Sequence, residues 1–221
     1  MSMEAPVAGP GEIADRIDPR PVRSRATVYE GAVWDVVQDR VDLGDAGEVT
    51  RDYVDHTGAV SIIAVRQREG REEVLLICQY RHPVGVFEWE PPAGLLDQDG
   101  EQPWEAAARE LGEEADLTAG RWYVLADYFS SPGGMSEALR VYLATDLADV
   151  PEAERHTRHE EEHGMPVRWV SLDEAHEAVL AGRLHNPSAV VGILAAHAAR
   201  ARGWETLRPH DAPWPWHPAH R

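Results

Sequence analysis

The sequence predicts an α+β fold, and three patterns support this prediction. Short, nearly continuous aliphatic runs at residues 60–65 and 74–79 are typical of buried strands. Residues 103–115 place apolar side chains at helical spacing, and further helical stretches follow at 172–181 and 188–202. A helix with one apolar stripe must bury that stripe, so we expect the first helix to pack against a sheet.

The N-terminal part is expected to differ from the rest of the chain. Its first 25 residues mix prolines and glycines with charges, a composition that cannot bury enough apolar area to offset chain entropy. We therefore expect a flexible leader over 1–25. Over 26–57, valines alternate with polar residues on both sides of a glycine-bearing turn at 44–47, which predicts a small antiparallel β module.

The main sheet is expected to begin with the strands at 60–65 and 74–79, joined by a hairpin turn at 68–71. A loop rich in proline and glycine at 90–97 then leads to the first helix. Pro103 suits the first turn of that helix, because its missing N–H would be unpaired there. The apolar stripe consists of Trp104, Ala107, Ala108, Leu111 and Ala115. Later strands are expected at 122–128, 139–143 and 167–170, followed by the two C-terminal helices and a tail at 206–221 that is either docked or loose.

Charge and composition exclude several classes of function. The 221 residues include 39 acidic and 21 basic side chains, a formal charge of −18, so we expect no nucleic-acid partner. Every basic residue is arginine, which excludes Schiff-base lysines and the lysine of a P-loop. Cys78 is the single cysteine, which excludes an internal disulfide and favours a reducing compartment. No apolar run approaches the roughly 20 residues of a membrane span, and we expect a cytoplasmic protein with no membrane partner.

The chemistry is concentrated on the first helix. Glu110, Glu113 and Glu114 stand at i, i+3 and i+4, side by side and opposite the apolar stripe. Such a pattern forms either a solvated acidic face or a site for a hard divalent cation, Mg²⁺ or Mn²⁺. Gly94 has no Cβ and lets the Ala93–Gly94 backbone approach closely, which leaves a main-chain carbonyl as a further ligand. We also expect Arg109 to clamp one of these acids by a bidentate pair.

These residues resemble the Nudix box of the Nudix hydrolases. The matching positions are Gly94, Glu101, Arg109 to Glu114, and Leu117. Two positions depart from the pattern: six residues instead of five separate Gly94 from Glu101, and Asp116 stands where the family usually has glycine. Aspartate is among the residues that tolerate left-handed geometry at a helix end. The resemblance implies a Nudix α/β/α sandwich with a mixed sheet over 58–205, preceded by the antiparallel N-terminal module.

The flanks at 79–82 and 89–97 resemble those of the ADP-ribose pyrophosphatases within this family, in an actinobacterial-like form. In that subfamily a proline follows the box by about sixteen residues, and Pro132 lies sixteen residues after Asp116. The resemblance implies Mg²⁺-dependent hydrolysis of ADP-ribose to AMP and ribose 5-phosphate. For the Pro132 loop taken alone, an ordinary turn between strands is the alternative.

The resemblance also implies roles for individual residues. The metal ligands would be Ala93, Glu110, Glu113 and Glu114, with Glu113 and Arg109 also acting in catalysis. A glutamate on a late loop would serve as the base, and the acidic segment 159–163 occupies that place. Glu162 is our first candidate and Glu161 the second, with Glu160 left open. A flexible acidic loop without a catalytic role is the alternative.

Substrate contacts are expected from seven residues: Arg81, Glu90, Gly94, Pro132, Gly133, Trp34 and Arg140. Of these, Arg81, Arg140 and Trp34 could each instead be structural. The family resemblance further implies a homodimer in which the N-terminal module crosses to the partner and completes its site. Two other functions remain open at this point. One is hydrolysis of another nucleotide, such as NADH or another sugar nucleotide, and the other is a catalytically silent nucleotide sensor.

Overall fold

A computed structural model describes residues 3, 5–157 and 164–218. Its contacts divide the chain into two compact units, one up to Tyr53 and the other from Val54 onward. The boundary falls within the last strand of the expected N-terminal module. Each unit has its own sheet.

The first unit is a three-stranded sheet in the order β1-β2-β3, made of β1 (Val22–Tyr29), β2 (Asp35–Asp42) and β3 (Glu48–Asp55). A short 3-10 turn, η1 (Gly44–Ala46), joins the last two strands, where the glycine-bearing turn is expected. Strand β1 pairs antiparallel with β2 and begins at Val22, inside the segment expected as a leader. All eight residues of β1 are exposed.

An ion pair between the half-exposed Arg25 of β1 and the buried Asp39 of β2 links two strands of this small sheet. Asp39 is 4% exposed and accepts hydrogen bonds from Nε and Nη2 of Arg25 at 2.8 and 2.7 Å. The Tyr53 hydroxyl donates to the same carboxylate at 3.0 Å. The hydrogen bond from Arg25 holds the pKa of Asp39 below its ordinary value. Among the described residues of this unit only Val37 and Asp39 are buried, so its apolar core is minimal.

The second unit contains an eight-stranded sheet with the order β10-β5-β4-β9-β8-β11, in which β6 pairs with β5 and β7 with β4. Strands β4 and β9 run parallel and the other strand pairs of this sheet are antiparallel, so the sheet is mixed as expected. The strands are β4 (Ala59–Arg68), β5 (Arg71–Arg81), β6 (Val86–Glu90), β7 (Ala93–Leu95), β8 (Leu117–Phe129), β9 (Ala138–Asp149), β10 (Val167–Ser171) and β11 (Arg208–Pro209).

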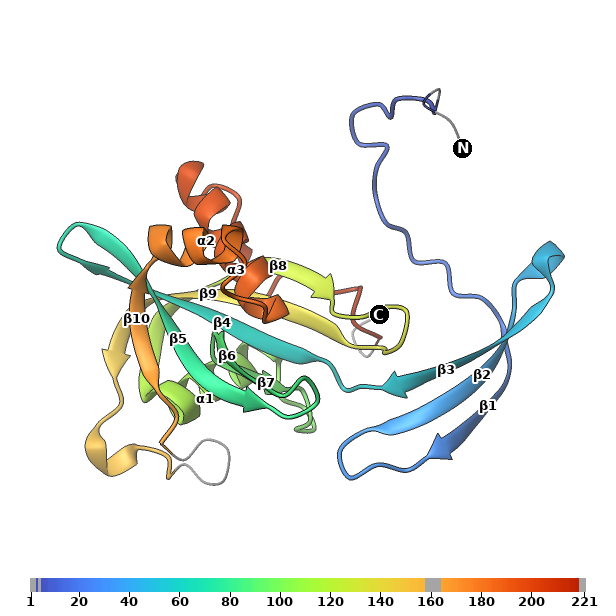
Figure 1. The fold of residues 1–221 in the computed structure, drawn as a ribbon, viewed down its shortest axis with the longest axis horizontal. Helices are drawn as coiled ribbons and strands as arrows, with labels where there is room; N and C mark the ends of the chain where they lie inside the picture. Colours follow the sequence, from blue (N-terminus) through green and yellow to red (C-terminus); the bar gives the residue numbers. More distant parts are fainter. Residues whose placement is uncertain (1–2, 4, 158–163, 219–221) are drawn as a thin grey trace. The chain divides into compact units, whose positions relative to one another are not determined.

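Helices cover both faces of this sheet (Figure 1). Helix α1 (Pro103–Ala115) lies on one face, and α2 (Leu172–Leu180) and α3 (Pro187–Ala201) lie on the other. The alternation of β4 serves both layers: Val60, Ile62 and Ala64 pack with α1, while Ile63 and Val65 pack with α2 and α3. This arrangement confirms the predicted α/β/α sandwich.

Turns, which depend on neighbouring residues, were predicted more accurately than strand pairing. The hairpin between β4 and β5 turns at Glu69 and Gly70, both with positive φ, where the sequence places a turn. The segment 90–97, expected as a loop, instead contains β7, because Ala93–Leu95 pairs with Ala59–Ser61 of β4. The buried face of α1 is centred on Ala106, Ala107 and Leu111, so Ala106 replaces Ala108 in the expected stripe.

The C-terminal tail is docked. Trp214 and His217 are each 4% exposed, and β11 pairs with β8. A second 3-10 turn, η2 (Glu152–Glu154), lies before the part of the acidic segment that is outside the described residues. In the part of the chain that the structure describes, no helix is both long and apolar enough to cross a membrane.

Candidate active site

The carboxylate of Glu110 lies directly against the backbone of β7. A Cβ added to Gly94 would stand 2.0 Å from both Cδ and Oε1 of Glu110, a distance that only glycine avoids. The close backbone approach expected at Gly94 therefore occurs, and the group that approaches is a carboxylate of α1. This contact fixes Glu110 between the helix and the sheet.

Glu114 points inward from the same helix. It is 5% exposed, and its Oε2 accepts the backbone N–H of Ala93 at 2.9 Å. The sequence placed all three carboxylates opposite the apolar stripe, and this prediction was wrong for Glu114. A buried carboxylate is stabilised when a donor replaces its lost water, and the Ala93 amide supplies one. Two carboxylates of α1 thus contact β7: Glu110 lies against Gly94, and Glu114 accepts the N–H of Ala93.

Arg109 holds three carboxylates at once. Its Nε and Nη2 donate to the two oxygens of Glu101, both at 3.0 Å, so the bidentate pair expected with Glu110, Glu113 or Glu114 forms with Glu101 instead. Its Nη1 donates to Oε1 of Glu110 at 2.6 Å and to Oε2 of Glu113 at 3.4 Å. These bonds, that of Glu101 foremost, hold the pKa of Arg109 above its ordinary value. The guanidinium therefore offsets the repulsion among the acids.

Helix α1 ends as the sequence predicts. Asp116 adopts left-handed geometry, with φ 55° and ψ 35°, and its N–H bonds back to Leu111 and Gly112. The substitution of aspartate for the usual glycine is therefore accommodated at the C-cap.

A cleft of about 580 Å³ opens beside this carboxylate face. Arg109 and Glu113 line one side, and the other side is formed by residues 154–157, which follow η2. Glu113 is the most exposed of the three α1 carboxylates, since 34% of its side chain is accessible. The cleft gives solvent and solutes access to the acidic end of α1.

A second buried carboxylate lies at the end of the β5–β6 ladder. Glu90 is 2% exposed and pairs with Arg81, whose Nη2 donates to Oε1 at 2.5 Å and whose Nε donates to Oε2 at 3.2 Å. Burial raises the pKa of Glu90, while the charge of Arg81 opposes that shift. The Arg81 side chain is 40% exposed, so this pair brings a fixed cation to the surface.

Comparison with known proteins identifies the arrangement. The NUDIX domain model matches residues 55–190. The chain belongs to the Nudix family. It is 42% identical over 193 residues to the ADP-ribose pyrophosphatase of Mycobacterium tuberculosis, covering 86% of this chain and 89% of that protein. It is 31% identical over 170 residues to the ADP-ribose pyrophosphatase of Bacillus subtilis, covering 77% and 88%.

A solved structure described as that of an ADP compounds hydrolase shares this Nudix fold. It superposes with a TM-score of 0.64 at 18% identity and covers 86% of this chain and 99% of the other. At that identity the match supports the fold, including the mixed sheet. The residues matched by the NUDIX domain model include the α1 carboxylates, β7 and the Arg81–Glu90 pair.

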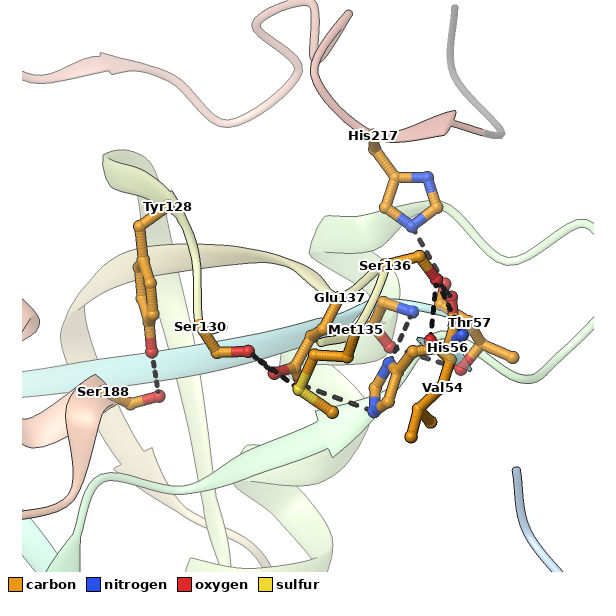
Figure 2. Close-up of polar contacts among 11 residues, drawn as sticks. Val54, His56, Thr57, Tyr128, Ser130, Met135, Ser136, Glu137, Ser188 and His217 are labelled. Atoms are coloured by element: carbon orange, nitrogen blue, oxygen red, sulfur yellow. Dashed lines mark hydrogen bonds and ion pairs between the residues drawn. The ribbon is translucent and has the colours of Figure 1, made fainter. Parts of the chain in front are cut away.

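The loop expected to close over a substrate is fastened to residues 54–57 (Figure 2). Pro132 and Gly133 are exposed in this loop, and the Gly134 carbonyl accepts the Val54 N–H at 3.0 Å. Glu137 contacts Nε2 of His56 at 3.4 Å and accepts a hydrogen bond from the Ser130 hydroxyl. Glu137 thus holds the base of this loop through Ser130 and His56.

Arg140 occupies a different environment from the one expected. It is 2% exposed, forms a bidentate pair with Asp127 at 2.7 and 3.1 Å, and donates to the carbonyls of Ala212 and Pro213. Its guanidinium carbon lies 4.7 Å from the centre of the Trp214 ring. The docked tail covers Arg140, so the structure assigns it to tail docking and we do not retain it as a substrate contact.

The structure describes Trp34, an expected substrate contact, but not the two residues expected as the catalytic base. Trp34 lies in the connection between β1 and β2 of the first unit and is 40% exposed. Glu161 and Glu162, expected as the catalytic base, lie outside the described residues. Glu101 matches the Nudix box but had no predicted role, and Asn186 was not predicted at all, yet both contact site residues. The signal for Glu101 is its place in the motif, eight residues before Arg109.

Proposed function

We propose that this Nudix protein hydrolyses the pyrophosphate bond of ADP-ribose, giving AMP and ribose 5-phosphate. The observation that carries the proposal is the carboxylate face of α1 seated against Gly94, next to an open cleft. The 42% identity to an ADP-ribose pyrophosphatase over most of both chains supports the choice of substrate. Arg81, Pro132 and Gly133 are the exposed residues that we propose contact it, together with Glu90 and Gly94 as their supports.

The residues of the chain divide the work. Hydrolysis adds one water across the P–O–P bridge, so an attacking oxygen must lose a proton and the leaving phosphate must carry new charge. Arg81 would offset phosphate charge at the surface, and Glu90 keeps its guanidinium oriented. Arg109 keeps the α1 carboxylates assembled before any ligand binds, so less reorganisation is needed on binding.

The substrate prediction can be checked directly. The protein is incubated with Mg²⁺ and, separately, ADP-ribose, NADH, ADP-glucose and ATP, and the phosphorylated products are identified by ³¹P NMR. We expect AMP and ribose 5-phosphate from ADP-ribose, with kcat/KM at least about tenfold above that for the other compounds. A higher kcat/KM for NADH or ADP-glucose would reassign the substrate, and no turnover of any compound would favour a binding role.

We also propose that a divalent cation, Mg²⁺ or Mn²⁺, binds at Ala93, Glu110, Glu113 and Glu114. The donors fit such an ion by type, since all are oxygens and the α1 carboxylates and the Ala93 carbonyl lie on facing elements. When bound, the ion would neutralise phosphate charge and lower the pKa of a water. In the described residues no three acidic, His or Cys side chains are arranged to hold a metal alone, so the carboxylates must turn partly away from Arg109.

The Gly94 contact provides a test of this assignment. Gly94→Ala places a methyl group where Glu110 lies, and we expect turnover of ADP-ribose to fall about 100-fold, because a displacement of about 1 Å can cost that much. The required Mn²⁺ concentration should rise, while the melting temperature changes little. Turnover is measured across a Mn²⁺ titration. Adding Glu110→Asp, which shortens the displaced side chain, should make the Gly94→Ala change less costly, and equal costs in both backgrounds would contradict a route through Glu110.

We propose Glu162 as the general base, with Glu161 second and Glu160 third. The support is their position: residues 154–157 of the same connection line the cleft beside Glu113. The neighbouring glutamates provide matched controls.

Separate Glu→Gln variants at these three positions should identify the base. Glu162→Gln is expected to lower kcat by about 10² to 10⁴, because the attacking water loses its proton acceptor. Glu161→Gln and Glu160→Gln should lower kcat by less than about tenfold. Single-turnover rates with saturating Mg²⁺ measure the chemical step. If all three variants keep wild-type rates, the base lies elsewhere.

We further propose a homodimer in which the first unit contributes to the partner's site. Trp34, which belongs to the first unit, would then contact the substrate in the partner's site. Exposed apolar side chains on this unit support the proposal that a second copy covers its surface. They are Val22, Val28, Tyr29, Val33 and Trp34. With only two buried residues described there, the unit gains stability from a second copy.

Light scattering on the purified protein tests this proposal. We expect a solution mass of twice the 24.6 kDa chain. Dilution below the dimer dissociation constant should reduce turnover per chain, because each site would lose the residues its partner supplies. A monomer with full turnover would end the proposal.

A further inference from the structure

The side chain of Asn186 accepts a hydrogen bond through its oxygen and donates through its nitrogen. Its Oδ1 accepts the Ala189 N–H at 3.0 Å and caps the N-terminus of α3. Its Nδ2 donates to Oε2 of Glu90 at 2.5 Å and lies 3.4 Å from Oε2 of Glu88. Serine, threonine and aspartate cap helices as well as asparagine does, but none of them also offers an amide donor. The choice of asparagine is therefore explained by Glu90.

The contact links α3 to a carboxylate that is already paired. Glu90 receives Arg81 on one side and Asn186 on the other, so its two oxygens are held from both directions. Asn186 is 9% exposed and Glu90 is 2% exposed. A hydrogen bond to a buried charged group is worth more than one at the surface, and a missing donor there is costly. Glu90 therefore has one well-defined position.

The position of Glu90 determines that of Arg81. The guanidinium uses Nε and Nη2 for Glu90, and among the described residues Arg81 forms an ion pair with no other carboxylate. The side chain is 40% exposed, so without a fixed anchor it would sample many rotamers. An ordered bidentate anchor keeps the outer edge of the guanidinium in place before a phosphate arrives.

We infer that Asn186 is a positioning residue for substrate binding, acting through Glu90 on Arg81. This inference rests on the proposed function, in which Arg81 contacts the diphosphate. It extends that proposal by assigning a role to the first turn of α3, which lies on the face of the sheet opposite α1. Its consequence is that KM depends on Asn186, while the chemical step at α1 does not.

The turn that carries Asn186 has a second support. Ser188 Oγ lies 2.9 Å from the hydroxyl of Tyr128 on β8, and burial raises the pKa of that hydroxyl to about 12. Tyr128 stays protonated at neutral pH and can bond to Ser188 (Figure 2). The start of α3 is thus attached to the sheet independently of Glu90. Removing the Asn186 amide should leave the turn in place.

Asn186→Ser separates the two bonds, because serine keeps the cap and loses the amide donor. We expect KM for ADP-ribose to rise about fivefold with kcat within about twofold, since ground-state and transition-state binding lose the same contact. In an Arg81→Ala background the same substitution should change KM by less than about twofold. An unchanged KM in the single variant, or an equal rise in both backgrounds, would overturn the inference.

Ser171→Ala serves as the matched control. Ser171 caps α2 by accepting the Glu174 N–H at 3.2 Å, so its loss removes a helix cap that has no contact with Glu90 among the described residues. The melting temperature should fall while KM stays at the wild-type value. A similar rise in KM would mean that any lost cap perturbs the site, which contradicts a specific path through Glu90.

A measurement without turnover distinguishes failure of this inference from failure of the proposed function. The Nε–Hε signal of Arg81 in a ¹H–¹⁵N spectrum, assigned with Arg81→Lys, should be sharp in the wild type and broadened in Asn186→Ser. A signal that is identical in both proteins would show that Arg81 is ordered without Asn186. If the broadening occurs but ADP-ribose is not hydrolysed, the substrate assignment fails and the positioning role stands.

Discussion

Repulsion among the carboxylates of α1 is the constraint around which the site is built. Glu110, Glu113 and Glu114 share one end of a helix, and like charges at this spacing destabilise it. Two groups offset this repulsion: the guanidinium of Arg109 and the backbone amide of Ala93. Both compensations act before any cation binds, so the fold is stable while its acids remain close together. A bound cation would take over part of the work of Arg109.

The sheet makes this compensation possible. Strand β7 has only three residues, yet its pairing with β4 places the Ala93 amide and the bare Gly94 backbone beside α1. Glu110 fits because a side chain is missing at Gly94, and Glu114 is satisfied because an amide is present at Ala93. Replacing this strand by an ordinary loop would remove the amide donor of the buried Glu114 and the close backbone beside Glu110. The positions of two α1 carboxylates therefore depend on Ala93 and Gly94 of this one short strand.

Features set by neighbouring residues were predictable from the sequence, and features set by distant pairing were not. The turn at Glu69–Gly70, the start of α1 at Pro103 and the left-handed Asp116 depend on local backbone preferences. Strand β7 and the inward direction of Glu114 depend on β4, which lies far away in sequence. Asn186 is separated from Glu90 by 96 positions. An Asn-Pro pair signals a helix start, but it gives no information about a carboxylate across the molecule.

The arginines show why residue type alone could not separate binding from packing. Arg81, Arg109 and Arg140 each form a bidentate pair with a carboxylate, and each lies on or next to a buried strand or helix. Their side chains are 40%, 23% and 2% exposed, respectively. The difference for Arg140 arises from the tail, whose carbonyls and Trp214 ring cover the guanidinium. In a chain without lysine, the same planar fork must serve both purposes, and what distinguishes them is whether a later segment of the chain covers it.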